Sequence, residues 1–196
     1  GIMCIFGAPN ASRDHAEKAI AAALTLQQKL PEINRWNTEH GYPAIETGIG
    51  INTGTILLGS LGNSRGARYT AVGDTVDRTF QIESCSLGGH VLVSNTTLKA
   101  VKTDVDHEFM IDYAQVYDQL SSMRIYEVYH IGGDWNIGEK RKIARPAGIS
   151  SPIDVMFRVI IGKHTDAQAH AAKITGMSED GLHMETYTIV SVLDNI

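Results

Sequence analysis

The stretch 68–83 places the tightest constraint on how this chain can fold. An apolar run prone to β structure ends at Gly73, and the residues after it have the spacing of an amphipathic helix. A strand that turns directly into a helix presents the N–H groups of the first helical turn at a cleft, where they can bind an anion. We therefore predict a strand over 68–72, a helix over 75–86 and a polar site between them.

Composition limits the classes of protein to which the chain can belong. Its 196 residues, 43% hydrophobic and 20% charged, are typical of a folded soluble chain. A net charge of −5 argues against nucleic acid as a partner, because nucleic-acid binding needs a basic surface. No apolar run approaches the roughly 20 residues that span a bilayer, and no signal peptide is expected, because residues 1–7 are too short and lack a basic start. Cys4 and Cys85 are expected to be buried free thiols, so we predict a cytoplasmic chain that spans no membrane.

Hydrophobic periodicity predicts an α+β domain over residues 1–131. One helix is expected over 14–30, ending at Pro31, and a shorter helix is expected to follow Ser94, whose hydroxyl would cap it. Strands that join one sheet are expected near 2–6, 45–52, 68–72, 90–93, 108–113 and 123–129.

The run 69–83 resembles the signature of the class III nucleotide cyclases, the family that makes cAMP or cGMP. The glycine-rich runs 48–54 and 59–62 precede it in the order and at the spacing of that family. The resemblance implies a ferredoxin-like α+β sheet with packed helices, and Mg²⁺ or Mn²⁺ ions in the intact family. It also implies that a nucleoside triphosphate is bound by residues at the strand end and the turn: Thr70, Gly73 and Asp74.

Two positions depart from this signature where the family carries out its chemistry. The family has an Asn that orients the ribose where this chain has Asp77, and an Arg that stabilises the transferring phosphate where it has Gln81. A carboxylate at position 77 would also set a negative charge beside a triphosphate. The family's triphosphate-binding lysine is missing as well, because no lysine lies between Lys102 and Lys140. We expect a cyclase-like site whose catalytic pair, Asp77 and Gln81, is degenerate.

The first residues resemble the end of the metal-binding part of the family. There, the strand that corresponds to residues 1–7 follows a turn with a metal-binding Asp, and an earlier strand carries a second Asp. Neither carboxylate is in this sequence, so we expect a piece of a longer protein that binds no metal ion by itself. Because cyclases pair two protomers head to tail, a homodimer or a cyclase-type heterodimer is expected.

A change of character follows the glycine-rich segment 132–138, which is expected to be a hinge. Residues 139–196 are expected to be the start of a second, β-rich domain. Their Arg-x-x-x-Arg and Gly-x-Ser-x-x-Gly motifs resemble those of the PilZ domain, a β-barrel receptor for cyclic di-GMP, although that family has Asp or Asn at the position of Gly176. Arginines can pair with phosphates and stack on guanines, but they can also be solvated linker charges. The residues implied in cyclic di-GMP binding are Arg141, Arg145, Ser178 and Gly181.

Three functions are open at this point. The first is a cyclase-homology signalling module with impaired catalysis that dimerises or binds nucleotide and is coupled to a cyclic di-GMP sensor. The second is an active adenylate or guanylate cyclase, a phosphorus–oxygen lyase, that uses unusual residues or a heterodimeric partner. The third is a structural interaction domain without a ligand. Product formation separates the second function from the others, and nucleotide binding separates the first from the third.

Overall fold

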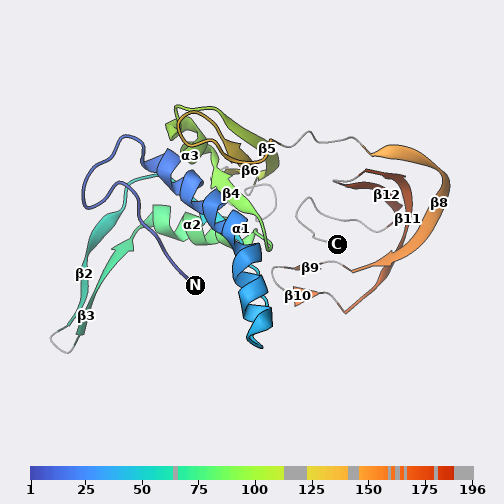
Figure 1. Ribbon diagram of the computed structural model, residues 1–196, viewed down its shortest axis with the longest axis horizontal. Helices are drawn as coiled ribbons and strands as arrows, with labels where there is room; N and C mark the ends of the chain where they lie inside the picture. The colour runs from blue at the N-terminus through green and yellow to red at the C-terminus, as the bar shows by residue number, and fades with distance from the viewer. Residues whose placement is uncertain are drawn as a thin grey trace. The chain divides into compact units, whose positions relative to one another are not determined.

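The computed structural model describes residues 1–63, 66–112, 123–140, 146–158, 160–161, 164–165, 167–178 and 181–187. The chain forms two compact units, which we call unit 1 (Gly1–Lys140) and unit 2 (Arg141–Ile196). Both are drawn in Figure 1. None of the described helices is long and apolar enough to cross a membrane.

Unit 1 combines a mixed sheet with helices. The described helices are α1 (His15–Glu39), α2 (Asp74–Ser84) and α3 (Asn95–Ala100). The sheet has the order β1-β4-β6-β5, with β7 also paired to β6; these strands are β1 (Ile49–Ile51), β4 (Val91–Ser94), β5 (Val105–Asp112), β6 (Arg124–Ile131) and β7 (Ile137–Gly138). β1 and β4 run parallel and the other pairs are antiparallel. β2 (Leu57–Asn63) and β3 (Gly66–Val72) form a separate antiparallel hairpin.

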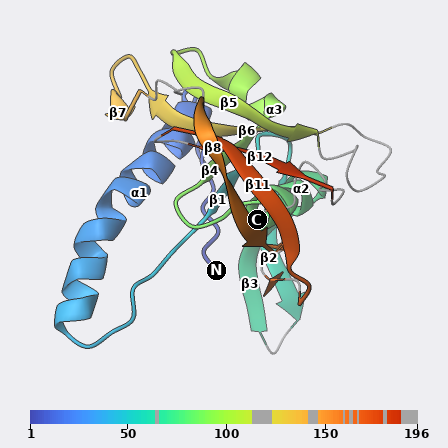
Figure 2. The ribbon, with the colours of Figure 1, turned by 90° about the vertical axis from the view of Figure 1, so that its right-hand side faces the viewer.

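The alternation of side chains along β1 lets two helices pack on opposite faces of the sheet. Ile49 and Ile51 pack against the cluster that includes α1. Gly48 and Gly50 point to the other face, where a Cβ on Gly50 would overlap the backbone of Glu83 in α2. Figure 2 shows α1 and α2 on either side of β1 and β4. The Gly-Ile-Gly-Ile run is therefore explained by packing, because glycine is required on the side where α2 touches the strand.

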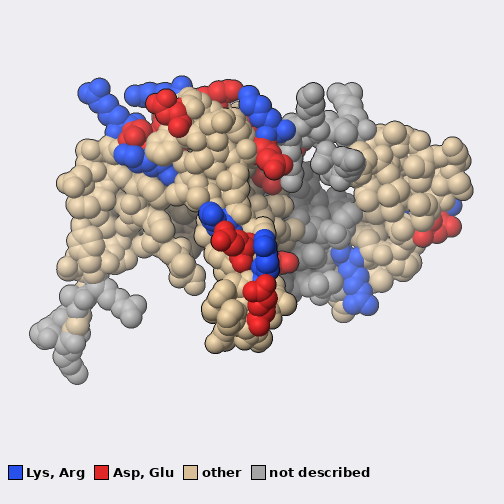
Figure 3. Space-filling model, viewed as in Figure 1, with Lys and Arg blue, Asp and Glu red and all other residues tan. Residues whose placement is uncertain are grey.

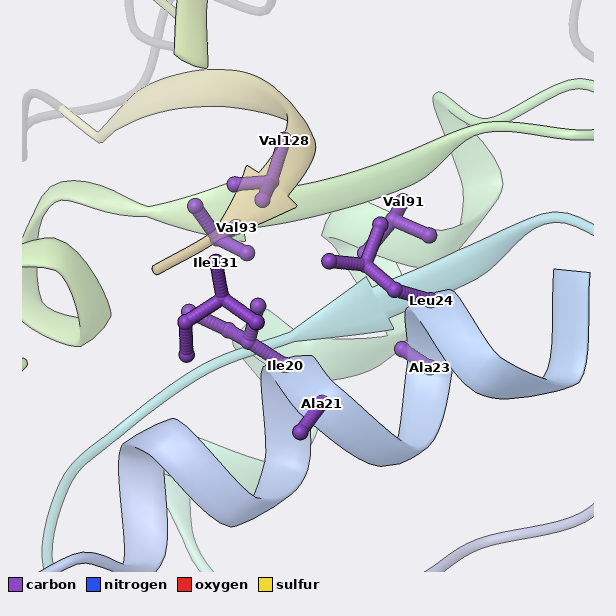
Figure 4. Packing of buried hydrophobic residues seen from close by; sticks show 8 residues of the cluster. All are labelled: Ile20, Ala21, Ala23, Leu24, Val91, Val93, Val128 and Ile131. Carbon is purple, nitrogen blue, oxygen red and sulfur yellow. The ribbon is translucent and has the colours of Figure 1, made fainter. Parts of the chain in front are cut away.

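The core of unit 1 lies between α1 and the sheet (Figure 4). Ile20 of α1 is completely buried, and burying a side chain of this size contributes roughly 1.5–3 kcal/mol. Glu17 is buried one turn earlier, and its Oε1 accepts the N–H of Lys102 just beyond α3 at 2.9 Å. The buried members of the cluster are Ile20, Ala21, Ala23, Leu24, Val91, Val93, Val128 and Ile131.

α1 is longer than the sequence predicted. It continues through Pro31 to Glu39, so the predicted end at Pro31 is wrong. The chain after the helix runs back beside it, and the side-chain amide of Asn34 donates to the carbonyl of Ile45 (2.9 Å) and accepts its N–H (2.7 Å).

The predicted strands are confirmed in part. Residues 2–6 form no strand, since no described strand pairs with them. Within the predicted range 45–52, only Ile49–Ile51 (β1) form a strand. The strand predicted at 68–72 is β3, which pairs with β2 and does not join the sheet. The strands near 90–93, 108–113 and 123–129 are confirmed as β4, β5 and β6. The Oγ of Ser94 accepts the N–H of Thr97 at 3.2 Å, so the predicted cap of α3 is confirmed as well.

Residues 132–138 do not form the hinge expected from their glycines. They make a turn and strand β7, which pairs with the end of β6. Trp135 and Ile137 pack against the core of unit 1. Gly138 has a positive φ of 95°, and a Cβ there would overlap the carbonyl of Tyr129. Its glycine thus permits a close approach between two strands, and the division between the units falls after Lys140.

Unit 2 is β-rich, as the sequence predicted. β8 (Ala147–Phe157), β11 (His170–Met177) and β12 (Leu182–Thr186) form an antiparallel sheet in the order β12-β11-β8, and β9 (Ile160–Ile161) pairs with β10 (His164–Thr165). Phe157 and Ala172 are buried there, beside Val155 and Met184. The relation of this sheet to a PilZ barrel stays a prediction.

Candidate functional site

The predicted passage from strand to helix is present at the end of β3. Gly73 is the N-cap of α2 and has a φ of 127°, a conformation that only glycine adopts without strain. The N–H groups of Val76 and Asp77 donate to the Gly73 carbonyl at 2.8 and 3.2 Å. Thr70 lies on β3, opposite Gly59 of β2. The residues predicted to bind nucleotide, Thr70, Gly73 and Asp74, therefore belong to one continuous strand, turn and helix.

Asp77 and Gln81 lie one helical turn apart on the side of α2 that faces away from the sheet. We call this the outer side of α2 (Asp77, Phe80 and Gln81). Asp77 is exposed, Phe80 is 56% exposed and Gln81 is half-buried. The opposite, inner side of α2 (Thr75, Thr79 and Ile82) includes Ile82, which is completely buried. The structure thus brings the two predicted catalytic positions together on an open surface.

The first turn of α2 carries two acidic side chains. Asp74 and Asp77 both lie there, where the partial positive charge of a helix N-terminus favours carboxylates. The last turn of α2 carries no basic residue. A triphosphate that approached this turn of the helix would meet two carboxylates of this chain and, directly after Asp77, the half-buried Arg78.

The β2–β3 hairpin exposes apolar side chains that the motifs did not reveal. Leu57 is 72% exposed, Leu61 is 51% exposed, and Val72, which pairs with Leu57, is 37% exposed. The described side chains of the hairpin are drawn tan in Figure 3 and carry no charge, whereas its two arginines, Arg65 and Arg68, have side chains outside the described ones. Exposed apolar surface of this kind marks sites of protein association. In the sequence, this exposed surface was indicated by the spacing of Leu57 and Leu61. That spacing could be interpreted only once the pairing of the two strands was known.

Comparison with known proteins shows the family. Residues 1–133 match the model of the adenylate and guanylate cyclase catalytic domain. The chain belongs to this family. It is 32% identical over 129 residues to adenylate cyclase 1 of Rhizobium meliloti (strain 1021), a match that covers 65% of this chain and 19% of that protein.

Two solved cyclase structures are similar as well. The guanylyl cyclase Cya2 is 32% identical with a TM-score of 0.59, and the match covers 68% of this chain and 67% of that one. The catalytic core of a rhodopsin-guanylyl cyclase with converted specificity, in complex with ATPαS, is 27% identical with a TM-score of 0.55 and covers 63% of each chain. The mixed α+β cyclase fold of unit 1 is thereby confirmed.

The described residues of this cyclase domain do not fit the metal ions that the family uses. No group of three or more His, Cys, Asp or Glu side chains in the described ranges could hold an ion. Asp74 and Asp77, the carboxylates nearest the turn, are both exposed on one helix. No chemical step is therefore assigned to a metal ion held by this part of the chain.

The structure describes two of the four residues predicted to bind cyclic di-GMP. Ser178 and Gly181 close the turn between β11 and β12, where the Ser178 N–H and Oγ both donate to the Gly181 carbonyl, at 2.8 and 3.2 Å. Arg141 and Arg145 lie outside the described residues. The proposed cyclic di-GMP site therefore stays a prediction.

Proposed function

We propose that this chain is a cyclase-homology signalling module that dimerises and binds a nucleoside triphosphate but has impaired catalysis. The observation that carries the proposal is α2. Its turn at Gly73 and its packing on β1 suit the family's fold, while its outer side presents Asp77 and Gln81 where the family has Asn and Arg. Gln81 can donate a hydrogen bond, but it has no charge with which to stabilise a transferring phosphate.

The size of the expected impairment follows from the number of groups that differ. Removing one preorganised donor at a site of this kind costs roughly 10²–10³ in rate. Two changes cost about 10⁴, and less than the product of the single effects where the groups act as a unit. Asp77 adds repulsion, because its carboxylate lies on the exposed outer side beside Asp74.

Nucleotide binding and pairing are supported by two further observations. The similar catalytic core was solved in complex with ATPαS, and this chain has the glycine turn that leads into α2. The exposed apolar side chains of the β2–β3 hairpin, Leu57 and Leu61, supply a surface that a second protomer would cover. A homodimer of such chains would contain two impaired sites. A heterodimer with a second cyclase chain would receive the missing Asn and Arg from its partner, which makes active cyclisation the second candidate function.

The test uses the full-length protein. Formation of cAMP from ATP and cGMP from GTP is measured with Mn²⁺, and binding is measured with the fluorescent methylanthraniloyl derivatives of both nucleotides. We expect saturable binding with negligible product. Ordinary cyclase turnover would establish the second candidate, and absence of binding would leave a structural interaction domain.

Unit 2 enters the proposal through its predicted cyclic di-GMP site. Each charge-assisted contact contributes ~1.5–3 kcal/mol, so Arg145→Ala is expected to weaken binding at least tenfold in calorimetric titration of the full-length protein. Lys173→Ala is the matched control, because Lys173 is an exposed cation of unit 2 that pairs with Asp154 at 3.3 Å. Absence of heat with saturating cyclic di-GMP would remove the sensor from the proposal.

A further inference from the structure

A series of polar contacts joins the first turn of α2 to the first turn of α3. The Nδ2 of Asn52, just after β1, donates to the carbonyl of Thr75 at 3.0 Å, and its Oδ1 accepts from Thr96 Oγ1 at 3.1 Å. Thr96 Oγ1 lies 2.7 Å from the Oγ of Ser94, the N-cap of α3. The orientation of the Asn52 amide is determined by these partners, because a carbonyl can only accept a hydrogen bond.

The side chain of Thr75 makes two further contacts that hold this residue in place. Its Oγ1 donates to the carbonyl of Thr55 at 2.8 Å. A Cβ on Gly54 would lie 2.5 Å from the same hydroxyl oxygen, so the backbone of Gly54 is close against it. Residues 52–55 thus hold both the carbonyl and the side chain of Thr75.

The other end of α2 is held by packing. A Cβ on Gly50 would overlap the backbone of Glu83, and a Cβ on Gly48 would overlap the side chain of Ser86. α2 is therefore attached to the sheet at two points, by close packing near its end and by the Asn52 contacts at its start. The start is the part that carries Asp77.

The direction of the outer side of α2 depends on this attachment. At 3.6 residues per turn, Asp77 lies about 200° and Gln81 about 240° around the helix from Thr75. Whatever fixes Thr75 against the sheet therefore sets where Asp77 and Gln81 point. We infer that Asn52 is a positioning residue for the site on α2, acting through the Thr75 carbonyl.

The role of Asn52 in ligand binding rests on the proposed nucleotide function, but its attachment of α2 to the sheet can be measured without nucleotide. The full-length protein is compared with Asn52→Leu, which has a similar volume and neither hydrogen bond. Amide hydrogen exchange of 76–82 is expected to rise about fivefold, which is ~1 kcal/mol at 1.4 kcal/mol per tenfold. Thr96→Val, which removes the bond to Asn52 Oδ1 and the contact with Ser94 Oγ but leaves the bond from Asn52 to Thr75, is expected to raise it about twofold.

The control is Thr38→Val, which removes an exposed threonine bond on α1, from Thr38 Oγ1 to the Asn34 carbonyl at 2.8 Å. It is expected to leave exchange in 76–82 unchanged. Equal exchange in Asn52→Leu and wild type, or equal effects of Asn52→Leu and Thr38→Val, would overturn the inference.

The second measurement is the affinity for methylanthraniloyl-GTP. Asn52→Leu is expected to weaken it about fivefold, whereas Thr38→Val leaves it unchanged. Faster exchange with unchanged affinity would show that Asn52 stabilises α2 without positioning the site, which overturns the inference. No binding by the wild type refutes the proposed function, and exchange in 76–82 then still decides whether Asn52 fixes the helix.

Discussion

The two sides of α2 are built under different constraints. On the inner side, Thr75 is held by Asn52 and Thr55, Ile82 is completely buried, and Gly50 leaves no room for a methyl group. On the outer side, Asp77 and Phe80 are exposed. A change on the inner side is opposed by packing, whereas a change on the outer side alters the chemistry and leaves the fold intact.

Under the proposed function, this difference explains how a chain can belong to the cyclase family and still have an impaired catalytic pair. The family match spans residues 1–133 and so includes both sides of α2. Fold and chemistry therefore have to be argued from different residues. Four predictions test that separation.

The largest effect is expected from restoring the family's residues on the outer side. Asp77→Asn combined with Gln81→Arg should raise cyclase turnover of the full-length protein by about 10²-fold or more, and more than either change alone, because each restores a group that acts in the transition state. Mass spectrometry of cAMP and cGMP measures the product. Ser84→Ala, an exposed change one turn beyond Gln81, is the control. An unchanged rate in the double variant would show that these positions do not limit activity.

On the inner side, adding one methyl group should destabilise the fold. Gly50→Ala is expected to lower the free energy of unfolding of unit 1 by about 3 kcal/mol, because the added Cβ overlaps the Glu83 backbone. Gly59→Ala is the matched control: it also lies in a strand, but a Cβ there would have nothing within 4 Å. Urea unfolding followed by tryptophan fluorescence reports on unit 1, because both tryptophans, Trp36 and Trp135, lie in it. Equal stability of the two variants would contradict the packing argument.

The sequence predicted what depends on neighbours along the chain. The turn at Gly73, the start of α2 and the cap at Ser94 are local, since a positive φ and a capping hydroxyl need only a few consecutive residues. The proximity of Asp77 and Gln81 was also predictable, because one helical turn separates them wherever the helix packs.

What the sequence could not predict depends on contacts between distant residues. α1 continues past Pro31, and Asn34 in its added part bonds to Ile45, a partner 11 residues away. The glycines of 132–138 suggested a hinge, yet Gly138 is needed for the close approach of β7 to β6. The exposed hairpin surface likewise became visible only once β2 was known to pair with β3 alone.

The third prediction concerns association of two protomers through the β2–β3 hairpin. If the exposed surface of β2 and β3 is a dimer interface, Leu57→Asp should raise the dissociation constant at least tenfold, since it places a charge in apolar surface that a partner buries. Ser60→Asp introduces the same charge at an exposed position on the opposite face of β2 and should have a smaller effect. Sedimentation equilibrium of the full-length protein measures both. A wild type that stays monomeric at all concentrations would rule out the interface.

The smallest effect concerns the thiol at the end of α2. Burial raises the pKa of Cys85, whose Sγ donates to the Gln81 carbonyl at 3.3 Å. Cys4 is exposed, so the prediction that both thiols are buried is wrong for Cys4. Because a raised pKa means less thiolate at a given pH, Cys85 should alkylate more slowly than Cys4 at pH 8, and its rate should climb at higher pH than that of Cys4. Iodoacetamide labelling between pH 7 and 10, read by peptide mass spectrometry, measures both thiols in one sample. Cys4→Ser is the control, because it should leave the Cys85 profile unchanged; a Cys85 profile that coincides with that of Cys4 would mean that the end of α2 is more open than its packing on β1 implies.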